Sequence, residues 1–263
     1  HNAGPRLAPV VAGALARAEK VIVVDDGCTD GSTDGAAEAG AEMLVFPVNR
    51  GKGHALLAGI ARALEHLETR VVCTMDADGQ HDPAELPGLL AAFDAARADL
   101  LIGRRTFDTG SVPWRSRFGN RATALVTRLL LGRDLPDTQC GYRLMSRGFA
   151  EALAGNLSGG RYETEMEMIV YAVRAGHTLA SAPVRTLYEP GNRSSHFRKV
   201  RDSWLIYARL LRAVRRFPRS LPLGGGPPAP FTVSPLPDST RESRRRNRPA
   251  VPPRCAARRF PRA

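Results

Sequence analysis

The sequence Met75-Asp76-Ala77-Asp78-Gly79-Gln80-His81 directly follows the apolar run Val71-Val72-Cys73-Thr74. The apolar run predicts a short buried strand, and the acidic residues come where that strand ends. Residues two apart point the same way in an extended chain, so we expect Asp76 and Asp78 to aim two carboxylates at one point, with Gln80 next on that side. Two adjacent carboxylates repel unless a cation joins them, and oxygen ligands suit Mg²⁺ or Mn²⁺. The stretch therefore predicts a divalent-metal site that grips a diphosphate, with an ordinary polar turn as the alternative.

A second apolar run also ends in acidic residues. Lys20-Val21-Ile22-Val23-Val24 is rich in β-branched residues and leads into Asp25-Asp26-Gly27-Cys28-Thr29-Asp30-Gly31-Ser32. In open α/β sheets, ligands bind in the crevice outside the carboxyl ends of the strands. Two strands that end in acidic loops, on a chain with a formal net charge of +12, therefore predict one acidic pocket on a basic molecule.

Strand-like apolar runs alternate with amphipathic helical runs over residues 1–216. This alternation is typical of βαβ units, so it predicts an α/β domain with a mostly parallel sheet flanked by helices. We expect strands at residues 20–25, 42–46, 71–75, 99–103 and 179–187. We expect helices at residues 5–18, 33–39, 53–67, 83–96, 117–131, 147–154 and 163–175.

Six motifs follow one another in the order seen in a known family. They are Asp25-Asp26-Gly27-Cys28-Thr29-Asp30, Asn49-Arg50-Gly51-Lys52-Gly53, Asp76-Ala77-Asp78-Gly79-Gln80-His81, Gly103-Arg104-Arg105, Asp137-Thr138-Gln139-Cys140-Gly141-Tyr142-Arg143 and Arg161-Tyr162-Glu163-Thr164-Glu165-Met166-Glu167. Together they resemble the family 2 glycosyltransferases with a GT-A fold, a Rossmann-like domain that binds nucleotide-diphospho-sugars. The match is to the branch of dolichyl- and undecaprenyl-phosphate sugar synthases, and it covers residues 1–216. The resemblance implies a metal-dependent, inverting transfer of a hexose from a UDP- or GDP-hexose donor to a polyprenyl phosphate.

The resemblance also implies which residues hold the donor. Asp25 and Asp26 are expected to contact the base or ribose, since a carboxylate accepts several hydrogen bonds. Asp76 and Asp78 are expected to reach the donor's diphosphate through the metal. Lys52 precedes a helix in a glycine-containing turn, where it is expected to reach a donor phosphate. The alternatives are an N-cap for the first two residues and a plain helix-entry turn around Lys52.

The acceptor side is expected to use arginines. Arginine forks match phosphate oxygens in pairs, and the resemblance assigns Arg117 and Arg143 to the lipid phosphate. A solvated basic face is the alternative for each. Glu165 is interpreted as a residue that positions an arginine or the acceptor, as a general base for a hydroxyl acceptor, or as an acid at the positive end of a helix.

Both ends of the chain depart from the family pattern. The family begins with an apolar strand that leads into a Tyr-Asn-Glu-like turn, and His1-Asn2-Ala3 falls where that turn belongs. We therefore expect the first strand, which is central in the family's sheet, to be missing, and the sequence to be a fragment or a truncated gene product. Residues 217–263 are rich in proline and arginine, a composition that predicts a disordered tail.

The basic charge favours anionic partners. Apolar and basic side chains alternate at helical spacing over residues 199–216, which predicts a basic amphipathic helix that either lies on an anionic membrane or packs on the domain. No apolar run reaches the roughly 18 residues needed to span a bilayer. The four cysteines are far apart in sequence, which fits a reduced compartment. We therefore expect a cytoplasmic protein, peripheral to the inner face of the cell membrane.

Three other activities are compatible with parts of the sequence. The first is sugar transfer to a saccharide or protein hydroxyl in cell-envelope polysaccharide synthesis. The second is sugar nucleotidyl transfer. The third is nucleic-acid binding through the arginine-rich tail, although no specific nucleic-acid partner is expected.

Overall fold

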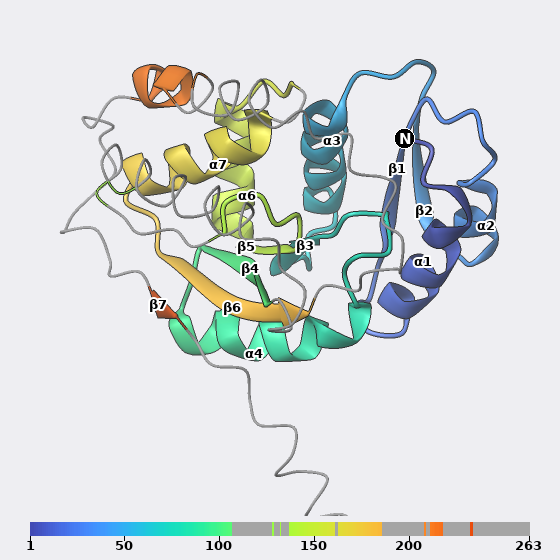
Figure 1. Cartoon of the computed structure of the whole chain (residues 1–263), viewed down its shortest axis with the longest axis horizontal. Helices are drawn as coiled ribbons and strands as arrows, with labels where there is room; N and C mark the ends of the chain where they lie inside the picture. The colour runs from blue at the N-terminus through green and yellow to red at the C-terminus, as the bar shows by residue number, and fades with distance from the viewer. Residues whose placement is uncertain are drawn as a thin grey trace, which may run out of the picture.

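The computed structural model of the chain (Figure 1) describes residues 1–106, 128, 132, 137–160, 163–185, 208, 211–217 and 232–233. The strands are β1 (Ile22–Asp26), β2 (Glu42–Phe46), β3 (Val71–Thr74), β4 (Leu100–Thr106), β5 (Arg143–Ser146), β6 (Leu179–Arg185) and β7 (Thr232–Val233). The helices are η1 (Gly4–Arg6), α1 (Leu7–Leu15), α2 (Asp34–Glu38), α3 (Lys52–Leu64), η2 (Pro83–Glu85), α4 (Leu86–Ala96), α6 (Arg147–Asn156) and α7 (Glu163–Arg174). These elements confirm the predicted α/β alternation. The helix predicted over residues 117–131 lies outside the described residues, apart from Arg128.

The strands form two sheets. β1 and β2 pair in parallel, with Ile22 opposite Glu42. The larger sheet has the order β3-β5-β4-β6-β7, in which β4, β6 and β7 run parallel. β5 is antiparallel to both of its neighbours, β3 and β4.

Strand β5 was not among the predicted strands. Its four residues, Arg-Leu-Met-Ser, include no β-branched residue, and it begins within a loop motif. Its backbone nevertheless fills the position between β3 and β4, so pairing with two neighbours offsets its weak intrinsic preference.

Helix α3 connects the two sheets. Among the described strands, β1 pairs only with β2 and β3 only with β5. α3 packs against β1, β3 and α6, and Gly59 on this helix lies so close to Val24 that an added β-carbon would be 3.1 Å from Val24 Cγ2. The N-terminus of α3 is thereby held at a fixed place relative to the ends of β1 and β3.

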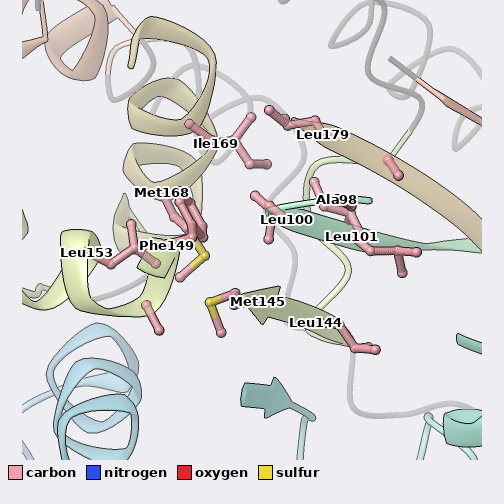
Figure 2. Packing of buried hydrophobic residues seen from close by; sticks show 14 of the residues in the cluster. Ala98, Leu100, Leu101, Leu144, Met145, Phe149, Leu153, Met168, Ile169 and Leu179 are labelled. Carbon is pink, nitrogen blue, oxygen red and sulfur yellow. The ribbon is translucent and has the colours of Figure 1, made fainter. Parts of the chain in front are cut away.

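The larger core lies between the five-stranded sheet and its helices. α4 covers one face of this sheet, and α6 and α7 cover the other (Figure 1). Figure 2 shows Leu100 of β4 on the side of Met168 and Ile169 of α7, whereas the next residue, Leu101, points away from that helix; all four are fully buried. Burying one such side chain stabilises the fold by roughly 1.5–3 kcal/mol. A separate, smaller core of Leu7, Val11, Ala36 and Ala41 holds α1 and α2 beside the two-stranded sheet.

The described part of the predicted amphipathic helix packs on the domain. Residues 211–216 are helical; Ala213 is buried, and the ring of Phe217 lies edge-on to Tyr171 of α7 at 5.3 Å between centroids. Arg216 binds Glu167 at 3.2 Å between NH1 and Oε2. The described face of this segment therefore packs on the domain.

The structure describes two places within residues 217–263, for which the sequence predicts disorder. Phe217 is buried against α7, and Thr232–Val233 forms β7 beside Ala180 and Ser181 of β6. The backbone edge of β6 presents hydrogen-bonding groups that pair with this short strand.

A glycine at the end of β1 brings two loops together. Gly27 has φ of +71°, and a β-carbon there would lie 2.7 Å from Asn49 N and 2.8 Å from Val48 C. Left-handed backbone and contact with another backbone both exclude a side chain at this position.

We predict that Gly27→Ala lowers the free energy of unfolding by roughly 2–4 kcal/mol, because backbone strain and overpacking add. Urea unfolding measures this change. The matched control is Gly155→Ala near the end of α6, where a β-carbon meets no atom within 4 Å, and which is expected to be neutral or slightly stabilising. Equal effects at the two glycines would contradict the prediction.

A partly exposed polar junction joins the starts of β4 and β6. Asp99 accepts hydrogen bonds from Thr178 N at 2.9 Å and Ser146 Oγ at 3.1 Å, and His177 Nδ1 lies 3.4 Å from its Oδ2. The hydrogen bond with His177 is the main cause that lowers the pKa of Asp99 below its ordinary value of 3.8, against the opposing effect of burial.

We predict that Asp99 makes stability depend on acid. A carboxyl whose pKa is lowered by folding contributes stability above its unfolded pKa, and that contribution is lost as pH falls below about 3.8 and through the folded value. Asp99→Asn should therefore lower the urea midpoint at pH 7, and its difference from the wild type should shrink as the pH falls below the ordinary pKa of 3.8. A difference that stays constant with pH would count against this account.

Candidate active site

Three charged side chains from distant segments meet at one point. Lys52 is the first residue of α3, Asp76 lies in the loop after β3, and Glu165 lies in the first turn of α7. Lys52 Nζ is 2.7 Å from Asp76 Oδ1 and 3.1 Å from Glu165 Oε1. The exposed fractions of the side chains are 35% for Lys52, 27% for Asp76 and 12% for Glu165, so solvent reaches the cluster from the lysine and aspartate side.

The environment of Asp76 stabilises its charge. Burial alone would raise the pKa of Asp76, but the hydrogen bond with His81 and the ammonium of Lys52 together lower it well below its usual range. His81 Nε2 lies 3.7 Å from Asp76 Oδ2. Burial likewise opposes the charge of Lys52, but the two carboxylates outweigh it and raise the pKa of Lys52. Both groups are therefore charged at neutral pH.

The backbone of Gly141 lies directly against Asp76. A β-carbon at Gly141 would lie 2.3 Å from Asp76 Oδ2, so only glycine leaves room for the carboxylate. The sequence prediction did not single out this residue. The sequence pattern that could have found it is the glycine between Cys140 and Tyr142, because a glycine between larger residues indicates that another group comes close to the backbone.

The loop after β3 turns rather than staying extended. Residues 77–78 form a turn, Gly79 has φ of +78°, and Asp78 Oδ1 accepts a hydrogen bond from Gln80 N at 3.0 Å. The expectation that Asp76, Asp78 and Gln80 share one side of an extended chain is therefore wrong. The reason is local, since an aspartate followed by glycine forms such turns readily.

His81 packs in the interior. It is buried, its ring centroid lies 5.4 Å from that of Tyr142, and the next residue, Asp82, caps η2 by accepting from Ala84 N at 2.8 Å. His81 is therefore a packing residue just before η2.

The residues present suit a hard divalent cation in their chemistry. Asp76, Asp78 and Gln80 offer oxygen donors, which Mg²⁺ and Mn²⁺ prefer. Within the part of the chain that the structure describes, however, no three His, Cys, Asp or Glu side chains are grouped to hold a metal ion. In this structure the ammonium of Lys52 lies beside Asp76 Oδ1 as its counter-charge.

Asp25 and Asp26 organise the loops beside the cluster. Asp26 accepts hydrogen bonds from Arg50 N at 2.6 Å and Gly51 N at 2.9 Å, immediately before Lys52. Asp25 accepts from Cys28 N at 2.6 Å and Thr33 Oγ1 at 3.1 Å. Although burial opposes the charge, these bonds lower the pKa of Asp25.

These contacts also settle the N-cap alternative. Neither aspartate is the N-cap of α2, whose N-cap position is Thr33 and has no side-chain cap bond. A carboxylate has about four lone-pair sites, so each retains capacity for a further ligand.

Arg143 is buried and its guanidinium binds backbone carbonyls. It is only 1% exposed, and its guanidinium donates to the carbonyls of Cys140, Thr138 and Glu165, each at 2.9 Å. The predicted direct contact between Arg143 and an acceptor phosphate is therefore not supported by this geometry. Instead, Arg143 joins the loop before β5 to the first turn of α7.

The other residues predicted for the acceptor side are only partly described. Arg105 forms a fork with Asp137, with Nε 2.8 Å from Oδ2 and NH2 3.1 Å from Oδ1, which holds the same loop against β4. Arg117 lies outside the described residues. A further link, missed from the sequence, joins His54 Nδ1 to the carbonyl oxygen of Gly160 at 3.2 Å and so ties α3 to the loop before α7.

Comparison with known proteins identifies relatives of the whole domain. The chain matches the family described as Glycosyl transferase family 2 over residues 1–154. It is 32% identical over 189 residues to polyprenol monophosphomannose synthase from Mycolicibacterium smegmatis, which covers 67% of this chain and 71% of that one. It is also 32% identical over 188 residues to undecaprenyl-phosphate mannosyltransferase from Micrococcus luteus, which covers 67% of this chain and 76% of that one.

A solved structure shares the fold. Glucosyl-3-phosphoglycerate synthase from Mycobacterium tuberculosis, crystallised with Mn²⁺, UDP-glucose and phosphoglyceric acid, superposes with a TM-score of 0.56 over 80% of this chain and 75% of that one, at 20% sequence identity. The likeness confirms the predicted GT-A fold. The family match supports glycosyl transfer over the alternative of nucleotidyl transfer. By its sequence match and its architecture, this chain belongs to glycosyltransferase family 2 and is a transferase with the GT-A fold.

Proposed function

We propose that this protein transfers a hexose from a nucleoside diphosphate sugar to a polyprenyl phosphate, with inversion at the anomeric carbon. The observation that carries the proposal is the meeting of Lys52, Asp76 and Glu165 where the loop after β3 reaches the first turns of α3 and α7. Asp76 and Lys52 are suited to the cation and diphosphate of a donor. Glu165 belongs to α7, the helix that follows the motifs assigned to the acceptor.

The donor side is assigned to the acidic loops. Asp76 and Asp78, with the amide oxygen of Gln80, are the residues that would hold Mg²⁺ or Mn²⁺, and a related fold was crystallised with Mn²⁺ and UDP-glucose. When bound, the ion would stabilise the negative charge that develops on the departing nucleoside diphosphate. Lys52 would add a second positive charge to the same diphosphate. Asp25 and Asp26 would contact the base or ribose through their remaining lone pairs.

The acceptor assignment rests on chemistry and on relatives. A phosphate is already an anion near neutral pH, so it attacks the anomeric carbon without needing a strong base. Glu165 fits this requirement, because its Oε1 is engaged by Lys52 and it is a poor candidate for a general base. The two relatives at 32% identity are named for transfer to, or synthesis of, polyprenyl-linked phosphates.

A second candidate is transfer to a soluble acceptor. It is favoured by the solved structure with phosphoglyceric acid, whose name describes glucosyl transfer to a phosphorylated three-carbon acid. That likeness has 20% identity against 32% for the lipid-linked relatives, so we place the lipid phosphate first.

Contact with an anionic membrane is part of the proposal. No helix in the described segments has the length and apolar character to cross a bilayer. On the helical residues 211–216, Ala213 faces the domain while Arg212 and Arg215 are exposed. Exposed arginines beside a packed helix attract anionic lipid headgroups by about 1 kcal/mol each. The protein would thus work at the inner face of the cell membrane, where its acceptor is anchored.

We predict that Asp78→Asn reduces sugar transfer at least about 100-fold, because a charged ligand is lost beside a developing anion. Asparagine keeps the side-chain oxygen that accepts from Gln80 N, so the turn survives. The assay follows labelled hexose from UDP- and GDP-sugars into undecaprenyl phosphate, with Mg²⁺ or Mn²⁺ and after chelation.

The matched control is Asp82→Asn in the same loop, which keeps its capping oxygen and lies outside the proposed ligand set. It should transfer sugar at the wild-type rate. Full turnover by the Asp78 variant would contradict the proposed role of Asp78 as a metal ligand. Turnover that survives chelation would contradict the proposed role of the metal ion in the reaction. Transfer to a soluble phosphorylated acceptor but not to the lipid would favour the second candidate.

A further inference from the structure

Lys52 stands between two carboxylates, those of Asp76 and Glu165. Asp76 and Glu165 come from segments far apart in sequence, and each lies within about one hydrogen-bond length of the same ammonium. Two carboxylates in a partly buried place repel unless a cation joins them. In this structure the joining cation belongs to the protein itself.

The positions of the three side chains define how Lys52 can move. The Asp76 carboxylate lies against the backbone of Gly141, where an added β-carbon would overlap it. The backbone of Glu165 is fixed, because Arg143 donates a hydrogen bond to its carbonyl oxygen at 2.9 Å. Lysine has a flexible four-carbon stem and a compact charge, so it is the mobile member of the cluster.

We propose that Lys52 is a resident counter-cation that competes with the divalent ion for Asp76 and, once displaced, remains paired with Glu165 and turns to the donor's diphosphate. This inference rests on the proposed function, since it concerns the same donor site. Lys52 would thus oppose metal binding in the absence of nucleotide and favour nucleotide binding in the presence of metal. The consequence is that metal and donor bind together rather than separately.

A competing cation and a purely structural ion pair predict different effects of removing Lys52 on the affinities for metal and for nucleotide. A structural pair would change stability when it is broken but would leave metal affinity alone. A competing cation, when removed, leaves Asp76 and Glu165 unneutralised, so a divalent ion should bind more tightly. The same removal takes one positive charge from the diphosphate, so the nucleotide should bind less tightly.

The test titrates Mn²⁺ alone into the full chain, and then UDP and GDP into the chain with saturating Mn²⁺, by calorimetry. Lys52→Met keeps the length of the side chain and removes its charge. We expect its affinity for Mn²⁺ alone to rise about tenfold and its nucleotide affinity in the presence of Mn²⁺ to fall about tenfold. Glu165→Gln should act in the opposite direction on Mn²⁺, because Lys52 then pairs with Asp76 alone.

Lys20→Met is the matched control. Lys20 also pairs with a carboxylate, Glu42, at 3.3 Å, but on β2 and away from the cluster. It should leave both affinities unchanged. Thermal unfolding of each variant shows whether it is folded before titration.

The outcomes separate the inference from the proposed function. An unchanged or weaker Mn²⁺ affinity in Lys52→Met, with the wild type binding Mn²⁺ and transferring sugar, would overturn the inference alone. A wild type that transfers no sugar to any polyprenyl phosphate would overturn the proposed function, whatever the titrations show. A wild type that transfers sugar but binds no Mn²⁺, with or without nucleotide, would overturn the inference together with the metal role.

Discussion

The site depends on one ammonium that holds two carboxylates. Lys52 is the first residue of α3, so its position is fixed by a helix that also packs against β1 and α6. Through Asp76 it holds the loop after β3, and through Glu165 it holds the start of α7. Neither carboxylate would be stable so near the other in a partly buried place without this charge. The rest of the site is arranged around that requirement.

The surroundings of the cluster are rigid because they are built from backbone contacts. Asp26 fixes the turn before α3 through the amides of Arg50 and Gly51. Arg143 fixes the first turn of α7 through a carbonyl. Hydrogen bonds between a charged side chain and buried backbone are stronger than neutral ones and cost more to break. These charged groups, which the sequence suggests as ligand contacts, therefore also serve as supports for the site.

Much of the fold follows from the sequence, while the geometry of the site follows only in part. The alternation of apolar and amphipathic runs located β1, β2, β3, β4 and β6, since hydrophobic periodicity is a local property. The sequence did not predict β5, because this strand is stabilised by pairing with β3 and β4 rather than by the strand preference of its own residues. Asp76, Lys52 and Glu165 were each selected from motifs, but no local pattern shows that one ammonium joins them. Arg143 shows a second limit of sequence analysis. The motif around an arginine does not reveal whether its side chain is buried against backbone carbonyls or exposed to a phosphate.

The identity of the cation in the cluster also has a physical reason. Of the 38 basic residues in the chain, three are lysine, at positions 20, 52 and 199, and the rest are arginine. An arginine at position 52 would present a planar fork that binds a carboxylate in two places and holds it in a fixed geometry. Lysine presents one compact charge with three donors, which can leave one carboxylate while keeping another. If the cation of this site must give way to a metal ion, lysine suits the position and arginine does not. This explains a lysine at position 52 in a chain that uses arginine for nearly every other positive charge.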